Sequence, residues 1–371
     1  MSVISKPTTR HAFSLVLLLG LASVLVPAPQ SVWQQDLLRT ALLLARVGTL
    51  LLLPGLALIA LLKPFKDMDI LQTVCLAAVT SLALFPLCLY WMGTLGGLWN
   101  ALLVRGLLVL CTSGVIWRVY KGRQLWLSSG KRPIWPVIAL ATIAGLGLAV
   151  RLYQIKGIPY PAWVDSYHHT IITQIMLDTG RVPQNYLPYA DLGSFLYHFG
   201  FHAISAFVAW ATGLPAHRAV FWGGQVLNAL TPLSLFFFVD RVGRDRRAAL
   251  VTAIICGLVC RMPAYYVNWG RYSQLAGQVI LPVALTALVE ACASRRDAGR
   301  SRWRAMIFGG TLAAGLFFTH YRVALLYFVG AIMFALAVLV RERHHLRQFW
   351  PACRRLLLLG CIALLLTLPW L

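Results

Sequence analysis

The sequence ALLLARVGTLLLLPGLALIALL, residues 41–62, decides the fold class. Arg46 is its only charged residue, and an α-helix needs roughly 20 predominantly apolar residues to cross the hydrocarbon core of a bilayer. A comparable run, SLVLLLGLASVLV, begins at Ser14, and others recur to the end of the chain. The sequence lacks the alternating segments of about ten residues that build an outer-membrane barrel. It therefore predicts an all-α polytopic membrane protein.

The composition agrees with this class. Of the 371 residues, 59% are hydrophobic and 12% are charged, whereas soluble domains have about 45–50% and about 25%. An ordinary soluble protein is thereby excluded. The eight cysteines lie mostly in apolar runs and form no CxxC pair, so they predict neither a zinc knuckle nor a disulfide framework.

Basic residues dominate the charge: 33 Lys and Arg stand against 11 Asp and Glu, a formal net charge of +22. They occur in discrete clusters, which suits the cytoplasmic loops of a membrane protein better than a nucleic-acid surface. We therefore expect no nucleic-acid partner. The clusters are Lys6/Arg10, Lys63/Lys66, 118–132, 241–247, 295–304 and 341–355.

The apolar runs predict about eleven transmembrane helices. The segment 195–212 is not counted, because a crossing there would place every later basic cluster outside; we expect an interfacial or re-entrant helix instead. With this count, 23 of the 33 basic residues are cytoplasmic. The first, uncleaved span ends at Pro27, and the others lie near 40–62, 70–92, 98–117, 134–152, 218–239, 248–266, 275–293, 305–319, 323–340 and 356–371.

A change in composition at residues 131–133 predicts two regions. Residues 1–132 form an N-terminal region of four plain spans, and residues 133–371 form a catalytic module whose polar residues concentrate on one side of the membrane. The chain stops at Leu371 inside an apolar run, so we expect the module to continue in a longer protein.

The external loop after the fifth span contains DSYHHTIITQIMLDTGRVP, which starts at Asp165. Asp165 is predicted to be the N-cap, Ile171, Ile172 and Ile175 share one helical face, and Gly180 follows the last turn. This pattern predicts an amphipathic helix lying on the membrane surface.

Asp165 is the predicted catalytic residue. Its carboxylate stands one turn before His168 and His169, in an aromatic and proline-framed loop at the bilayer surface. A carboxylate beside two imidazoles suits acid–base chemistry. The alternative is a helix cap worth about 1 kcal/mol.

These residues resemble a known family. Asp165-Ser166-Tyr167-His168-His169 is similar to the D-P-Y-Y-H stretch of oligosaccharyltransferase catalytic subunits, and the G-R-V-P exit and the short aromatic helix that follow are also similar to the GT-C superfamily of membrane glycosyltransferases. The resemblance covers roughly residues 134–340. In most members the acidic loop follows the first span, whereas here it follows the fifth.

The resemblance implies a fold and an activity. GT-C enzymes, including those of the protein mannosyltransferase type, carry external juxtamembrane helices and transfer a sugar from a polyprenyl-phosphate donor. The acceptor would be a glycan, a lipid or a protein on the non-cytoplasmic face of a bacterial or archaeal plasma membrane. Only Asp165 carries over directly, as the acid at the reaction centre of an inverting transfer in which we expect His168 and His169 to contact the substrate.

A divalent metal, Mn²⁺ or Mg²⁺, is a second hypothesis for this face. His198 and His202 are four residues apart, so a helix would place them on one side, with a third ligand from the acidic loop or from Asp191. The alternative is a helix with two amphipathic residues at headgroup level.

Two further external motifs suit a phosphate. Arg271-Tyr272 and His320 to Arg322 place arginines among aromatic residues at the membrane interface, where a guanidinium can form bidentate bonds to phosphate. The alternative for each arginine is lipid anchoring by snorkelling.

Two other functions remain open from the sequence. A transporter or flippase would place ionisable residues near bilayer mid-depth and break helices in paired halves. A non-catalytic envelope-assembly protein would need neither feature.

Overall fold

The computed structural model describes residues 7–26, 37–121, 133–293, 300–341 and 349–370. Within these residues the chain is helical and contains no β-strand. The α-helices are α1 (Pro7–Leu25), α2 (Leu37–Leu62), α3 (Ile70–Thr94), α4 (Ala101–Tyr120), α5 (Trp135–Gln154), α6 (Val164–Thr179), α7 (Gly200–Thr212), α8 (Ala216–Phe238), α9 (Arg246–Ile254), α10 (Arg261–Asn268), α11 (Tyr272–Ala293), α12 (Arg300–Thr319), α13 (Tyr321–Arg341) and α14 (Phe349–Thr367).

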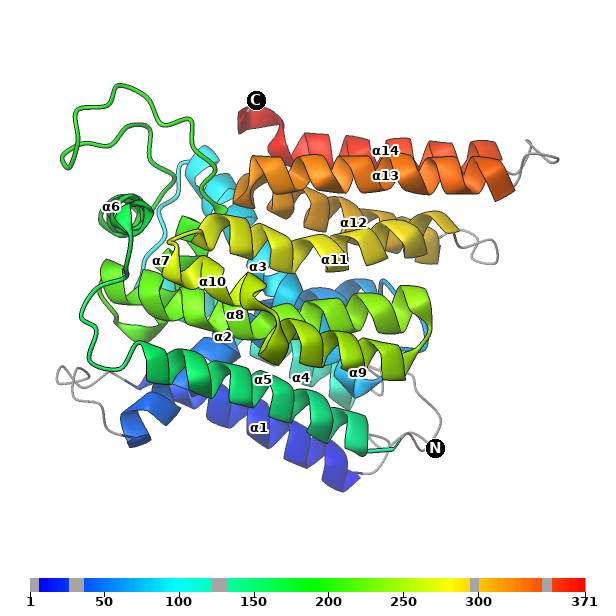
Figure 1. Ribbon diagram of the computed structural model, residues 1–371, viewed down its shortest axis with the longest axis horizontal. Helices are drawn as coiled ribbons and strands as arrows, with labels where there is room; N and C mark the ends of the chain where they lie inside the picture. Colours follow the sequence, from blue (N-terminus) through cyan, green and yellow to red (C-terminus); the bar gives the residue numbers. More distant parts are fainter. Residues whose placement is uncertain (1–6, 27–36, 122–132, 294–299, 342–348, 371) are drawn as a thin grey trace.

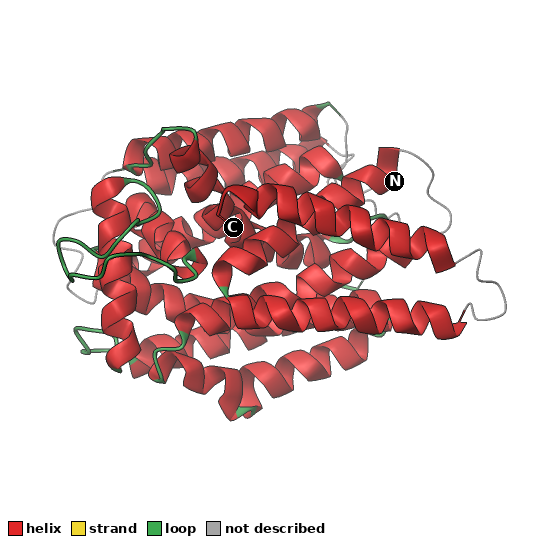
Figure 2. Ribbon diagram, turned by 90° about the horizontal axis from the view of Figure 1, so that it is seen from above, coloured by secondary structure: helices red, strands yellow, loops and turns green. Residues whose placement is uncertain are grey.

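The long helices run along the long axis of the molecule, as a membrane bundle requires (Figure 1). The helix α6 is seen end-on in this view, so it crosses the ends of the long helices. Seen from above, the long described loops gather at this same end of an otherwise helical molecule (Figure 2). The polar segments that the sequence predicts to be external are therefore assembled at one end of the bundle.

Eight of the described helices are long and apolar enough to cross a membrane, namely α2, α3, α4, α5, α8, α11, α13 and α14. A ninth span results if α9 and α10, which are bent by 40° at their break, are counted together. The other two of the eleven predicted spans are α1, whose apolar part is short, and α12, which begins with three arginines in five residues. The helices are compatible with a polytopic integral membrane protein, and the count of eleven stays a prediction.

One predicted span is broken. The prediction of a continuous helix over 248–266 is wrong, because the backbone is extended at Cys260, with ψ 134°, and at Met262, with ψ 135°. Met262 precedes Pro263, whose ring disfavours a helical conformation in the residue before it. The carbonyl of Pro263 accepts a hydrogen bond of 3.0 Å from Asn228 of α8, which stabilises the break.

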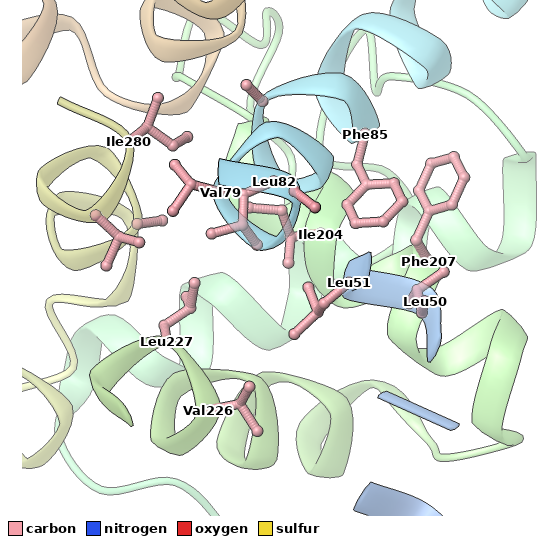
Figure 3. Close-up of a cluster of buried hydrophobic side chains, with 14 of the residues drawn as sticks. Leu50, Leu51, Val79, Leu82, Phe85, Ile204, Phe207, Val226, Leu227 and Ile280 are labelled. Atoms are coloured by element: carbon pink, nitrogen blue, oxygen red, sulfur yellow. The ribbon is translucent and has the colours of Figure 1, made fainter. Parts of the chain in front are cut away.

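The core is a continuous cluster of buried apolar side chains around α3. Figure 3 shows this cluster, in which α3 lies between side chains of α2, α7, α8 and α11. Phe85 of α3 stacks on Phe207 of α7 with ring centroids 4.7 Å apart. Helices of the N-terminal region and of the later module therefore share one core. The predicted boundary adjoins residues 122–132, outside the described residues, and the division stays a prediction.

The short helix α7 lies inside the end of the bundle. All thirteen of its residues are buried, and at 1.5 Å per residue it is about 20 Å long, too short to cross a bilayer by itself. Because other parts of the protein bury every face of α7, its burial does not distinguish the interfacial from the re-entrant alternative for 195–212. Both alternatives stay predictions.

The opposite end of the bundle contains a buried ion-pair network. Arg246 at the start of α9 lies 2.7 Å from Asp69 and 2.7 Å from Asp240. Asp69 is the N-cap of α3 and forms a capping box with Gln72, which also donates a hydrogen bond of 2.7 Å to Asp240. The network joins the ends of α3, α8 and α9.

Candidate active site

The helix α6 begins two residues earlier than the sequence pattern predicts. Its N-cap is Trp163, with φ 74° and no side-chain capping bond, and Asp165 lies in the first turn. The prediction that Asp165 is the N-cap is therefore wrong, and its carboxylate is left to contact other groups. The predicted end is confirmed, because Gly180 adopts the left-handed conformation with φ 68°.

The partner of Asp165 is Arg271, from the turn between α10 and α11. The carboxylate Oδ2 lies 2.9 Å from the guanidinium, and the two side chains are 35% and 43% exposed. The guanidinium also lies over the ring of Trp269, 4.9 Å from its centroid. Exposed ion pairs contribute only about 0–1 kcal/mol to stability, so this pair is accessible to a ligand and contributes little to holding the fold.

Gly270 allows this turn to dock against α6. Its φ is 63°, and a Cβ at this position would lie 3.0 Å from the Oγ of Ser166 and 3.3 Å from the Cβ of Asp165. Only glycine combines this backbone conformation with so close an approach. The turn therefore brings Arg271 to the first turn of α6.

A chain of neutral imidazoles lies behind the ion pair. Nε2 of His169 is 3.0 Å from the carbonyl oxygen of Gly270, which can only accept, so this nitrogen carries the proton. Nδ1 of His169 then accepts from Nε2 of His202 at 2.8 Å. Burial lowers the pKa of His169 to about 4, against a smaller opposing effect of the Gly270 carbonyl, and lowers the pKa of His202 well below its usual range. Both imidazoles are therefore neutral at pH 7.

His198 does not share a helical face with His202, and that prediction is wrong. His198 precedes α7, whose first residue, Gly200, packs so closely on Thr319 that a Cβ would lie 2.5 Å from its hydroxyl oxygen. This contact fixes where the helix starts. The ring of His198 stacks instead on Tyr197, with centroids 3.9 Å apart.

His320, in the turn between α12 and α13, and Arg322, in the first turn of α13, complete the site. The His320 ring lies 4.4 Å from that of His198, and its Nδ1 accepts a bond of 3.3 Å from the backbone of Val323, capping α13. Burial, with the positive charges of Arg322 and Arg271, lowers the pKa of His320 to about 4. Arg322 is exposed and makes no hydrogen bond or ion pair with any described residue.

The structure brings together most of the predicted site residues. Asp165, His169, His198, His202, Arg271, His320 and Arg322 meet at one end of the bundle. Tyr272 is fully buried, stacked on Phe201 at 5.3 Å and edge-on to His169 at 5.8 Å, so it supports the site from behind. His168 is exposed on α6, beside His169 in sequence.

The residues predicted to bind a metal do not fit one coordination sphere. Nε2 of His202 is engaged by His169, and exposed Asp191 makes no hydrogen bond or ion pair with a described residue. Across the part of the chain that the structure describes, no group of three His, Cys, Asp or Glu side chains is arranged to hold a metal ion. Metal dependence stays a prediction.

The chain belongs to the family of unknown function DUF6541, which matches residues 48–371. No curated protein and no solved structure matches the chain. The DUF6541 match extends from α2 to the end of the chain and so includes every residue of the site.

Tyr197 is a site residue that the sequence pattern did not single out. It contacts His198 and His202, and burial raises the pKa of its phenol, as does the nearby negative charge of Asp165. Its phenol therefore stays protonated and can donate a hydrogen bond. The only signal in the sequence is its place beside His198 in an aromatic segment, which is common at membrane interfaces.

Proposed function

We propose that this chain is a membrane glycosyltransferase of the GT-C type. It transfers a sugar from a polyprenyl-phosphate donor to a glycan, lipid or protein acceptor on the non-cytoplasmic face. The observation that supports it best is the half-exposed pair of Asp165 and Arg271 at the end of the bundle, with Arg322 nearby. A base and two phosphate-binding cations are the groups that this reaction needs.

The position of the site suits a lipid-linked donor. Arg271 precedes the first residue of α11, and Arg322 lies in the first turn of α13. Both helices are long and apolar enough to span a membrane, so their first turns lie at headgroup depth. A polyprenyl phosphate keeps its phosphate at that same depth.

Asp165 acts as the general base. Its carboxylate takes the proton of an acceptor hydroxyl while the hydroxyl oxygen attacks the anomeric carbon of the donor sugar. The bond between that carbon and the phosphate oxygen breaks, and the polyprenyl phosphate leaves with the electron pair. Attack opposite the leaving group inverts the anomeric configuration, and loss of such a base typically costs 10²–10⁴ in rate.

The two arginines stabilise the leaving phosphate. The guanidinium of Arg271 has five N–H donors and uses NH1 for Asp165, so other donors remain for phosphate oxygens. Arg322 is exposed beside His320 and adds a second positive charge. The neutral His169–His202 chain fixes the Gly270 turn without adding repulsive charge beside Arg271.

A transporter or flippase is the rival function. Many transporters consist of two structural repeats, and a broken helix occurs at the corresponding position of each repeat. Among the described helices one pair is bent at a break, α9 with α10. An enzyme with its polar groups at one end fits this arrangement better.

Reconstitution tests the proposal. The full chain in proteoliposomes receives polyprenyl-phosphate monosaccharides that carry tritiated hexoses or pentoses, together with a membrane extract as acceptor. The proposal predicts that free polyprenyl phosphate appears in amounts equal to the sugar transferred, with the opposite anomeric configuration in the product. Movement of intact donor across the bilayer without cleavage identifies a flippase and overturns the proposal.

A further inference from the structure

A cavity lined by arginines and apolar side chains lies at the end of the bundle opposite α6. It has a volume of about 670 Å³ and opens between the first turns of α12 and α14. Its lining includes Arg302 and Trp303 of α12 and Trp350, Arg354 and Arg355 of α14. The beginnings of both helices lie at the end of the molecule that the charge distribution predicts to be cytoplasmic (Figure 1).

The charge of this cavity is one-sided. Among the described residues, ten line the cavity; none of them is acidic, and three are arginines. Arg355 donates a hydrogen bond of 2.7 Å to the carbonyl of Cys292 at the end of α11, which holds it in place. The buried Nε of Arg302 makes no hydrogen bond with any described residue, and a buried polar group without a partner is unfavourable. A bound anion would satisfy it.

The chemistry of the lining selects an amphipathic anion. Guanidinium groups form bidentate, charge-assisted bonds with phosphate, and the N-termini of two long helices add partial positive charge. Exposed tryptophans at the rim, with Leu357 and Leu358 beyond them, continue the cavity onto an apolar surface. A free phosphate would contact only the arginines, whereas a phospholipid would contact the arginines with its headgroup and the apolar surface with its acyl chains.

We propose that this cavity binds the phosphate headgroup of an anionic phospholipid of the cytoplasmic leaflet. Its acyl chains lie along the exposed apolar side chains of α14. Basic cavities between transmembrane helices on this side of a membrane are suited to such lipids. The site is separate from the proposed catalytic centre and does not depend on the proposed activity.

Native mass spectrometry of the full chain in detergent tests the site. The protein is titrated with phosphatidylglycerol, with phosphatidylcholine of the same acyl chains, and with inorganic phosphate. We expect retained phosphatidylglycerol adducts, few phosphatidylcholine adducts, and at least about a tenfold loss of phosphatidylglycerol affinity in Arg302→Gln/Arg354→Gln, because each arginine contributes to headgroup attraction.

The matched control is Arg244→Gln/Arg247→Gln. These exposed arginines lie at the same end of the molecule, Arg244 between α8 and α9 and Arg247 in the first turn of α9, and their loss removes the same net charge without changing the cavity. Equal losses in the two double variants would overturn the proposal, because they would indicate general surface attraction. Binding of inorganic phosphate without phosphatidylglycerol would overturn it as well. An unchanged thermal unfolding midpoint shows that each variant is folded.

Discussion

The two ends of the bundle each hold an arginine–carboxylate contact, and the contacts differ in burial. At the end with Arg246, the carboxylates of Asp69 and Asp240 are 8% and 6% exposed. At the end with α6, Asp165 is 35% exposed and its partner Arg271 is 43% exposed. The first contact is part of a closed network that joins three helices, whereas the second remains open.

This difference separates structural from chemical roles. Breaking a buried pair leaves an uncompensated charge and costs about 3–5 kcal/mol, whereas an exposed pair contributes about 0–1 kcal/mol. We therefore expect substitutions at the Arg246 end to change stability and substitutions at Asp165 to change activity.

The largest expected effect concerns the sides of the membrane. In a variant without native cysteines, a cysteine at Ser194, in the loop before α7, should be labelled by an impermeant maleimide only from outside. A cysteine at Ser301, near the start of α12, should be labelled only from the cytoplasm. Labelling of both from the same side would contradict the topology, and with it the non-cytoplasmic site.

Asp240→Asn should destabilise the fold by about 3 kcal/mol, because it removes one of the two buried negative charges that pair with Arg246. The thermal unfolding midpoint in detergent measures the effect. Asp245→Asn is the control, since this exposed residue caps α9 and asparagine caps equally well. Equal midpoints for the two variants would mean that the network is not structural.

The buried histidines predict a stability that depends on pH. In the unfolded chain the imidazole of a histidine has a pKa near 6.5. In the folded protein, burial lowers the pKa of His169 to about 4. The unfolded state therefore binds more protons between these values, so stability is lost as pH falls from about 6.5 to about 4, by on the order of 3 kcal/mol for this residue. His169→Gln should flatten the profile of midpoint against pH, and His168→Gln, on the exposed side, should leave it unchanged.

A smaller effect on stability is expected at Gly270. Gly270→Ala should cost about 1–3 kcal/mol, because alanine strains the positive φ and its Cβ meets Ser166. It should also lower transfer activity by displacing Arg271. Gly145→Ala, in α5 with no atom near its added Cβ, should be neutral or slightly stabilising. A Gly270→Ala protein with both properties unchanged would show that the docking of this turn is not required.

Long apolar runs allowed most helix bounds to be predicted. The expected span 70–92 is α3, Ile70–Thr94, and 134–152 is α5, Trp135–Gln154. A transmembrane helix can be predicted from its own residues alone, because the run must remain apolar over the thickness of a bilayer. The broken span is the exception, since the pattern of hydropathy does not show the local effect of Pro263.

The sequence allowed us to predict which residues belong to the candidate site, but only part of how they are arranged. The acid and both arginines of the candidate site were singled out from their positions in motifs predicted to be external. The contact of Gly200 with Thr319 and the His169–His202 bond join residues far apart in sequence, so the true start of α7 and the tautomers were not predictable. The N-cap at Trp163 was missed because Asp165 has the better capping side chain but pairs with Arg271 instead.

The most direct test of the central claim is to measure turnover, donor binding and unfolding together in Asp165→Asn. The predicted result is a 10²–10⁴-fold loss of turnover, unchanged donor affinity within about threefold, and an unfolding free energy within about 1 kcal/mol of wild type. Asp178→Asn, in the same helix, should behave as wild type, since an amide can still accept the bond from Tyr189. Near-normal turnover in Asp165→Asn would contradict the assignment of Asp165 as the base.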